Sequence, residues 1–284
     1  MTAVLKPAVT AGRKVVHRTR GHTHGPITRL MSPSDLGELL KPFVFLDLFV
    51  SDDPAQLGGF PMHPHSGIAT LTYLVAGGME YADSTGQSGQ LQAGSVEWMR
   101  AGGGVWHTGK PTDDVPAHGF QLWIALPEAL ENAPAESQYL SPAALTHSGP
   151  ATVLLGQYAG VRSAIAHPAD ATYLAVHLRA GETWTYQPPA GHSVGWLAVD
   201  VGELDLPEPV VRGDMLVFDQ SEDPITLRAQ TDAVLVLGSA VPHPHPLVMG
   251  RYSVHTSAEA LRRGEDGIRQ VAQRLRAEGV LGQR

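Results

Sequence analysis

The sequence predicts an all-β fold of two β-barrel or jelly-roll lobes with a C-terminal helix. The chain of 284 residues contains 31 glycines and 22 prolines, and this enrichment in turn-forming residues favours many short connections. Its apolar segments are short and recur about every ten residues, a spacing typical of sandwiches and small barrels. The series is interrupted once by a proline-rich break and then resumes, which indicates two lobes.

The first series of predicted strands lies between about residues 40 and 125. It comprises residues 43–50, 69–75, 79–82, 89–93, 96–99 and 119–126. The third and fourth of these segments flank Asp83-Ser-Thr-Gly86, a cluster of turn-forming residues typical of a hairpin. We therefore expect a barrel-like sheet in this part of the chain.

Residues 127–150 are rich in proline and follow neither a helical nor a strand pattern, so they are predicted to link the lobes. A second series follows at residues 152–155, 173–178, 182–186, 194–201, 215–218, 225–229 and 233–237. These patterns predict an N-terminal domain over residues 1–130, a linker over 131–150 and a C-terminal domain over 151–284 that includes the closing helix.

The closing helix is predicted from the segment that begins at Thr256. Thr256-Ser-Ala-Glu259 fits a capping box, in which the two polar side chains satisfy free backbone N–H groups. Gly279 supplies a stop signal. Gly264 and Gly267 weaken the helical pattern. The apolar positions that would share one helical face are Leu261, Ile268, Val271 and Leu275.

Composition excludes or disfavours several classes of function. The formal net charge is -8 and no dense run of Lys and Arg occurs, which disfavours direct binding to nucleic acid. The absence of cysteine excludes disulfides, thiolate nucleophiles and zinc–cysteine sites. Residues 1–10 do not resemble a signal peptide, and no apolar run is long enough to span a membrane. We therefore expect a soluble cytoplasmic protein that does not act on membranes.

The 14 histidines include three His-x-His pairs, and this spacing is suited to metal binding. On a strand, residues i and i+2 point to the same face, about 6.6–6.8 Å apart along the chain. Two such imidazoles can converge on one ion at about 2.0–2.2 Å, provided that a third ligand comes from a neighbouring strand. The pairs are His22/His24, His63/His65 and His243/His245.

A third ligand is indicated for His63 and His65 only. The glycine-rich run Ala101-Gly-Gly-Gly104 leads to His107, which a close backbone approach can bring to the same barrel mouth. The sequence therefore predicts a metal site of His63, His65 and His107, with the alternative that they are hydrogen-bonded core histidines. The other two pairs show no third ligand or lie between prolines. His118, His177 and His192 are expected to be structural, and the second lobe is expected to hold no metal.

Four segments follow, in order, the pattern of one known family: Phe60-Pro-Met-His63-Pro-His65-Ser-Gly67, Gly78-Met-Glu-Tyr-Ala-Asp83-Ser84, Gly94-Ser-Val-Glu-Trp98-Met99-Arg-Ala101-Gly102 and His118-Gly-Phe-Gln121-Leu-Trp123. With matching segments near both ends, the chain resembles the pirin family over nearly its whole length. Pirins are bicupins whose N-terminal cupin domain holds iron or a similar metal through three histidines and a glutamate. Some act as quercetin 2,3-dioxygenases, and the mammalian protein is a nuclear coregulator of transcription.

The resemblance implies that His63, His65 and His107 hold one divalent transition metal, with iron favoured and zinc, copper, nickel and manganese as alternatives. The chain departs from the family at the fourth ligand, because Gly109 stands where the family has glutamate. Three neutral imidazoles leave a divalent site at about +2 rather than +1, which shifts its preference from Fe(II) and Mn(II) towards Zn, Cu or Ni. Glu97 is a candidate substitute, but its place before Trp98 predicts that it points elsewhere.

Three hypotheses about function follow from these observations. The leading one is a metal-dependent dioxygenase of the quercetinase type that acts on a flavonol-like small molecule at an open coordination position. The second is a metal-binding regulatory module with a protein partner, for which a carboxylate ligand is dispensable. The third is a degenerate cupin that binds no metal.

Overall fold

The first lobe is built from a seven-stranded antiparallel sheet and a four-stranded antiparallel sheet. The computed structural model describes residues 12–51, 59–112, 116–167, 169–206 and 208–282. The larger sheet has the order β12-β9-β6-β11-β4-β3-β2 and the smaller one the order β5-β10-β7-β8. The elements are β2 (His22–His24), β3 (Ile27–Met31), α1 (Leu36–Leu40), β4 (Phe43–Ser51), β5 (Phe60–His65), β6 (Ile68–Ala76), β7 (Gly78–Asp83), β8 (Ser88–Gln92), β9 (Val96–Arg100), β10 (Val105–Pro111), β11 (Ala117–Ala125) and β12 (Glu136–Leu140).

The second lobe contains another seven-stranded sheet, in the order β1-β22-β19-β24-β17-β14-β13, where β1 is Val15–Thr19, with three short two-stranded ribbons. A short 3₁₀ helix at Pro142–Ala144 precedes it. Its strands are β13 (Thr146–Ser148), β14 (Ala151–Leu155), β15 (Gln157–Tyr158), β16 (Val161–Arg162), β17 (Ala171–Leu178), β18 (Thr183–Tyr186), β19 (Val194–Val201), β20 (Glu203–Leu204), β21 (Val210–Val211), β22 (Met215–Phe218), β23 (Ile225–Arg228) and β24 (Ala233–Ala240). The predicted all-β bicupin with a C-terminal helix is thus confirmed.

The two large sheets pack against each other through one shared apolar cluster. In this cluster the ring of Phe43 on β4 contacts Trp196 on β19 edge-on, with ring centroids 5.4 Å apart. Because strand residues alternate, the opposite face of the first large sheet points into the first barrel. Trp98 is fully buried in the cluster between the lobes, whereas Glu97 faces the barrel interior beside Thr72. Strands buried on both faces therefore separate the lobe contact from the interior of the first barrel.

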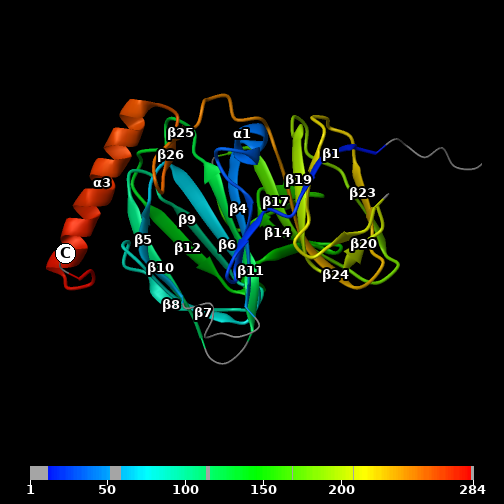
Figure 1. Cartoon of the computed structure of the whole chain (residues 1–284), viewed down its shortest axis with the longest axis horizontal. Helices are drawn as coiled ribbons and strands as arrows, with labels where there is room; N and C mark the ends of the chain where they lie inside the picture. The colour runs from blue at the N-terminus through cyan, green and yellow to red at the C-terminus, as the bar shows by residue number, and fades with distance from the viewer. Residues whose placement is uncertain (1–11, 52–58, 113–115, 168, 207, 283–284) are drawn as a thin grey trace, which may run out of the picture.

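The N-terminal strand packs on the second lobe, and the C-terminal helix packs on the first lobe (Figure 1). The N-terminal strand β1 (Val15–Thr19) pairs with β22 of the second lobe. The C-terminal strands β25 (Val248–Met249) and β26 (Val254–His255) and the helix α3 (Ala258–Ala277) return to the first lobe, where α3 packs on β10. The predicted domain boundaries do not anticipate this exchange of terminal segments.

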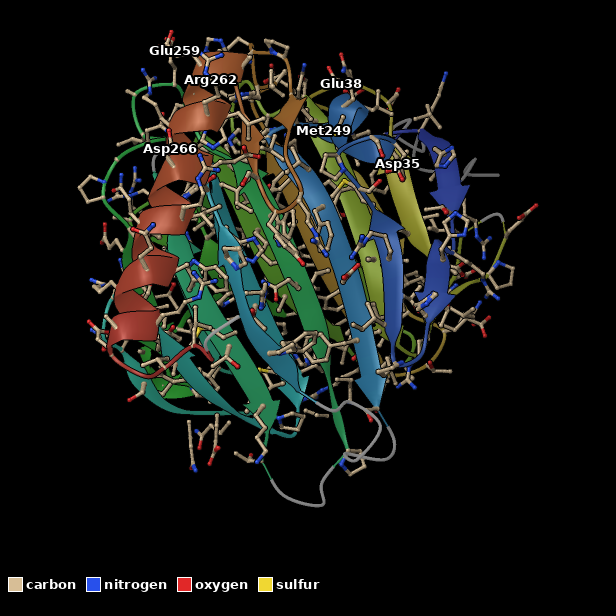
Figure 2. All side chains as sticks on the ribbon, turned by 60° about the vertical axis from the view of Figure 1, so that its left-hand side comes forward. Asp35, Glu38, Met249, Glu259, Arg262 and Asp266 are labelled. Atoms are coloured by element: carbon tan, nitrogen blue, oxygen red, sulfur yellow. The ribbon has the colours of Figure 1, made fainter. Side chains whose placement is uncertain are left out.

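Helix α3 lies along the outside of the first lobe with its polar side chains outward, and Glu259, Arg262 and Asp266 project from its exposed side (Figure 2). The indole N–H of Trp106 donates to the carbonyl oxygen of Ile268 at 3.0 Å. The structure explains why a glycine stands at position 267 of this helix: a Cβ there would overlap the carbonyl oxygen of Gly103. The glycine therefore allows the helix backbone to approach the glycine-rich run closely.

Two local predictions were wrong. The N-cap of α3 is Ser257, whose hydroxyl accepts from the backbone N–H of Ala260 at 3.2 Å, because Thr256 donates to Glu131 instead. The segment 131–150, predicted to lack regular structure, contains β12 and β13, each paired at the edge of a large sheet where proline-rich flanks are tolerated. Within the described residues, no helix has the length and apolar character that a membrane crossing requires.

Candidate metal centre

The structure brings together the imidazoles of His63, His65 and His107. His63 and His65 lie on β5, and His107 lies opposite His63 on the neighbouring strand β10. One nitrogen from each ring falls in a group whose members all lie within 4.8 Å of one another. The Nε2 atoms of His63 and His107 are 3.0 Å apart. The structure thus joins two histidines from one strand with a third that is distant in the sequence.

Each of the three rings has an acceptor at its other nitrogen. Nδ1 of His63 lies 2.8 Å from the carbonyl oxygen of Pro61, and Nδ1 of His65 lies 3.1 Å from that of Tyr252. Nδ1 of His107 lies 3.0 Å from Oε1 of Glu97. Because these partners only accept, we assign the proton of each neutral ring to Nδ1, which leaves the Nε2 lone pairs free. This arrangement is the usual one around metal-ligating histidines.

The environment keeps these rings in the neutral form that binds metals. Burial, and secondarily the neighbouring His107, lowers the pKa of His63 to about 4. Burial also lowers the pKa of His65 well below its usual value. Nε2 of His65 is buried and has no hydrogen-bond partner among the described residues. An orphaned buried acceptor beside two further nitrogen lone pairs fits a divalent cation, so the donor set and its geometry suit a metal.

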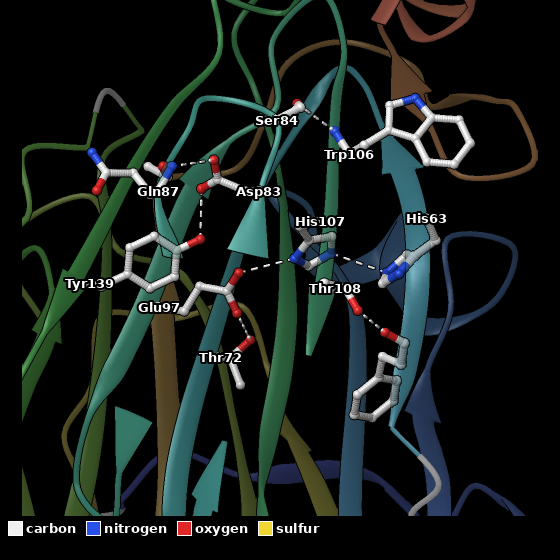
Figure 3. Close-up of polar contacts among 12 residues, drawn as sticks. His63, Thr72, Asp83, Ser84, Gln87, Glu97, Trp106, His107, Thr108 and Tyr139 are labelled. Atoms are coloured by element: carbon white, nitrogen blue, oxygen red, sulfur yellow. Dashed lines mark hydrogen bonds and ion pairs between the residues drawn. The ribbon is translucent and has the colours of Figure 1, made fainter. Parts of the chain in front are cut away.

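Glu97 does not join the group of ligand atoms, as expected, but its side chain does point into the barrel, towards the far side of the His107 ring. Its Oε1 atom accepts from His107, and its Oε2 atom accepts from the hydroxyl of Thr72 at 3.0 Å (Figure 3). The side chain comes from β9 and is 4% exposed. Strand alternation sends Glu97 into the barrel because Trp98, its neighbour, packs between the lobes. Glu97 therefore lies behind His107, on the side of the ring away from Nε2.

A pocket of about 250 Å³ opens onto His63 and His65. Phe45 and Trp123 stack within it with ring centroids 4.1 Å apart, and Trp123 also contacts the ring of His65 at 4.8 Å. Arg29 lies over the Phe45 ring and forms an ion pair with Asp47 at 2.7 Å. The walls of the pocket are thus mainly aromatic, and the Arg29–Asp47 ion pair lies at one side.

The C-terminal segment is tied to this site by buried polar contacts. The hydroxyl of Ser66 lies 2.8 Å from that of Ser253 and 3.0 Å from Nε2 of His255. Nδ1 of His255 lies 3.1 Å from Oε2 of Glu131, a carboxylate that is 1% exposed. The same segment supplies the Tyr252 carbonyl that orients His65. No sequence pattern indicated this network, because its members are distant in the chain and Glu131 lies next to the proline-rich break.

The remaining histidines do not form a comparable group within the described parts of the chain. His22 and His24 are exposed on the edge strand β2, and the rings of His243 and His245 lie 5.4 Å apart without a third ligand. The three histidines expected to be structural each have a hydrogen-bond partner: His118 contacts Asp200, His177 contacts Tyr73, and His192 contacts Asp170 and Ser239.

Comparison with known proteins supports one family. The family model described as Pirin matches residues 9–124. A pirin-like protein of Caulobacter vibrioides is 31% identical over 249 residues, covering 84% of this chain and 90% of the relative. Two solved structures share the fold. A quercetin 2,3-dioxygenase from Acinetobacter baumannii superposes with a TM-score of 0.81 at 22% identity, covering 92% of this chain and 98% of that one. A bacterial pirin from Escherichia coli in complex with nickel(II) superposes with a TM-score of 0.60 at 21% identity, covering 81% and 98%.

The similarity to the Caulobacter relative extends over both lobes, and the fold and the three histidines are those that the sequence motifs led us to expect. The chain is a bicupin with a histidine cluster able to bind a divalent metal, and it belongs to the pirin family.

Proposed function

We propose that the protein is a metal-dependent dioxygenase of the quercetinase type, which acts on a flavonol-like small molecule. The observation that carries this proposal is the convergence of three imidazole nitrogens, two of which belong to rings that line an aromatic pocket. Such a site offers a cation with free coordination positions next to a surface that suits a flat ring. A quercetin 2,3-dioxygenase shares the fold, which adds support.

His63, His65 and His107 would hold one divalent transition metal. When bound, such an ion polarises a substrate oxygen and, if it is redox-active, supports reaction with dioxygen. Iron is the metal of the family pattern, whereas the missing carboxylate at Gly109 favours nickel, copper or zinc. The nickel complex of the related Escherichia coli pirin supports this second preference.

The residues of the pocket have separate tasks in this proposal. Phe45 and Trp123 stack on each other and present aromatic surface to the substrate ring. The side-chain nitrogen of Gln121 is buried at the pocket wall without a partner among the described residues, so it can donate to a substrate oxygen. Arg29 is held in place by Asp47. Tyr252 lines the pocket beside His63 and His65, with its ring centroid 6.4 Å from each of theirs.

The test is oxygen uptake with quercetin after the metal-free protein has been loaded separately with Fe, Ni, Cu and Mn. We expect turnover with at least one metal, loss of turnover in His65→Ala, and retention in His245→Ala, which changes a histidine outside the cluster. If none of the four metals supports turnover, this activity is wrong. The two alternatives, a regulatory module and a metal-free scaffold, are not favoured, because neither requires ligand nitrogens that face a pocket of this size. Cytoplasmic location and the lack of a nucleic-acid partner remain predictions from the sequence.

A further inference from the structure

The interior of the first barrel holds a buried carboxylate that touches the histidine cluster from behind. This inference rests on the proposed function in one respect, since it takes the three histidines as metal ligands. In the family pattern a carboxylate binds the metal directly, from the position that Gly109 occupies here. The question is whether this chain has lost that negative charge or has placed it elsewhere.

The position of the direct carboxylate is occupied in part by the side chain of Met79. A Cβ atom at Gly109 would lie 2.7 Å from the sulfur of Met79 and 3.7 Å from the ring of Phe60. Met79 is 3% exposed and lines the same small cavity as His63 and His107. A glutamate at position 109 would therefore meet a packed thioether before it reached the cluster. A fourth ligand at this position therefore requires Met79 to move.

Glu97 is placed and held on the opposite side of His107. One of its oxygens accepts from Nδ1–H of His107 at 3.0 Å, and the other accepts from the hydroxyl of Thr72 at 3.0 Å. In the described part of the chain, its charge meets no Lys or Arg within ion-pair distance. Burying a carboxylate without a cationic partner costs free energy. A cation bound at Nε2 of His107 would reduce this cost, because its positive charge acts on Glu97 through the His107 ring.

We propose that Glu97 is the positioning residue that supplies, through His107, the negative charge that a direct carboxylate ligand supplies in the family pattern. The hydrogen bond fixes the ring of His107 with Nε2 towards the cluster and gives this ring partial imidazolate character. The ring is then a stronger donor, and the combined charge of ion and carboxylate is about +1 instead of about +2. The net charge of the site is thus the same as with a direct carboxylate ligand, but the negative charge lies behind His107.

The test is the affinity of the metal-free protein for nickel(II), measured by competition with a chromogenic chelator. Glu97→Gln keeps the shape and one acceptor oxygen but removes the charge. We expect nickel(II) to bind about ten- to a hundredfold more weakly than to the wild type. The visible absorption of the cobalt(II)-loaded protein should also shift, which a purely structural role would not cause. The matched control is Asp170→Asn, which neutralises the carboxylate that contacts His192 in the second lobe at 3.0 Å. It should alter neither readout.

A second variant separates charge from packing. In Glu97→Gln combined with Met79→Ala and Gly109→Glu, the truncated methionine gives the new glutamate room to reach the cluster directly. We expect this triple variant to recover nickel(II) affinity towards the wild-type value. Affinity and cobalt spectrum that are unchanged in Glu97→Gln, or no recovery in the triple variant, would overturn the assignment. Failure of the wild type to bind nickel(II) would instead overturn the metal site itself, and absence of quercetin turnover would leave the affinity result standing.

Discussion

Replacing Gly267 by alanine tests how α3 is seated on the first lobe. In an exposed helix, a change from glycine to alanine stabilises by about 1 kcal/mol, because alanine has the higher helix propensity. Here the new methyl group would overlap the carbonyl oxygen of Gly103. Gly104 also lies close to the helix, since a Cβ there would be 2.7 Å from the backbone nitrogen of Ile268. Neither contact involves a flexible side chain that could move away.

The magnitude follows from three contributions. Overpacking against backbone costs about 1–3 kcal/mol. Displacement of the helix also breaks the 3.0 Å hydrogen bond from Trp106 to Ile268, which is worth about 1 kcal/mol. After the gain of about 1 kcal/mol in helix propensity, we expect Gly267→Ala to lower the free energy of unfolding by about 1–3 kcal/mol. The sign is therefore opposite to that of the same substitution on an exposed helix.

Urea unfolding followed by tryptophan fluorescence measures this change. Gln270→Ala is the matched control, because Gln270 is exposed on the same helix, and it should change stability by less than about 0.5 kcal/mol. A Gly267→Ala variant as stable as the wild type, or more stable, would refute the close approach of α3 to the glycine-rich run.

Three further predictions concern other parts of the molecule. Burial lowers the pKa of His167 from 6.5 to about 3. As pH falls, this histidine therefore takes up a proton in the unfolded chain before it does so in the folded one. The free energy of unfolding should fall by about 2 kcal/mol between pH 7 and pH 5. His167→Phe should lack this part of the pH dependence in urea titrations, and an unchanged pH dependence would contradict the prediction. Glu131→Ala leaves the buried ring of His255 and two partly buried donors of Thr256 without their acceptor, and it should destabilise the protein by about 3 kcal/mol, measured in the same way. Trp123→Leu should raise the KM for quercetin several-fold with unchanged metal content, and an unchanged KM would remove Trp123 from the substrate surface.

The sequence predicted the histidine cluster because its signals are local. The i, i+2 spacing of His63 and His65 places both rings on one strand face, and the glycine run before His107 indicated a close approach. The orientation of Glu97 could not be predicted in this way. Strand β9 is buried on both faces, so its pattern does not say whether Glu97 or Trp98 faces the second lobe. Only the packing of the two large sheets decides that choice.

The terminal segments show a second limit of the sequence. Strand β1 pairs with β22. Arg18 on β1 and Arg20 just after it form ion pairs with the buried Asp214, and a local sequence pattern cannot predict contacts between residues so far apart in the chain. Glu131 acquires its partners only when the C-terminal segment returns to the first lobe. Contacts of this kind depend on the arrangement of whole lobes, which periodicity and turn chemistry do not determine.

The most direct test of the account is the number of metal ions bound per chain. The metal-free protein would be incubated with nickel(II) and desalted, and its metal content would be measured by inductively coupled plasma mass spectrometry. We expect about one ion per chain for the wild type and for His245→Ala, and almost none for His107→Ala. A wild-type protein that retains no nickel, or that retains as much as His107→Ala, would contradict the claim that the three imidazoles share one ion.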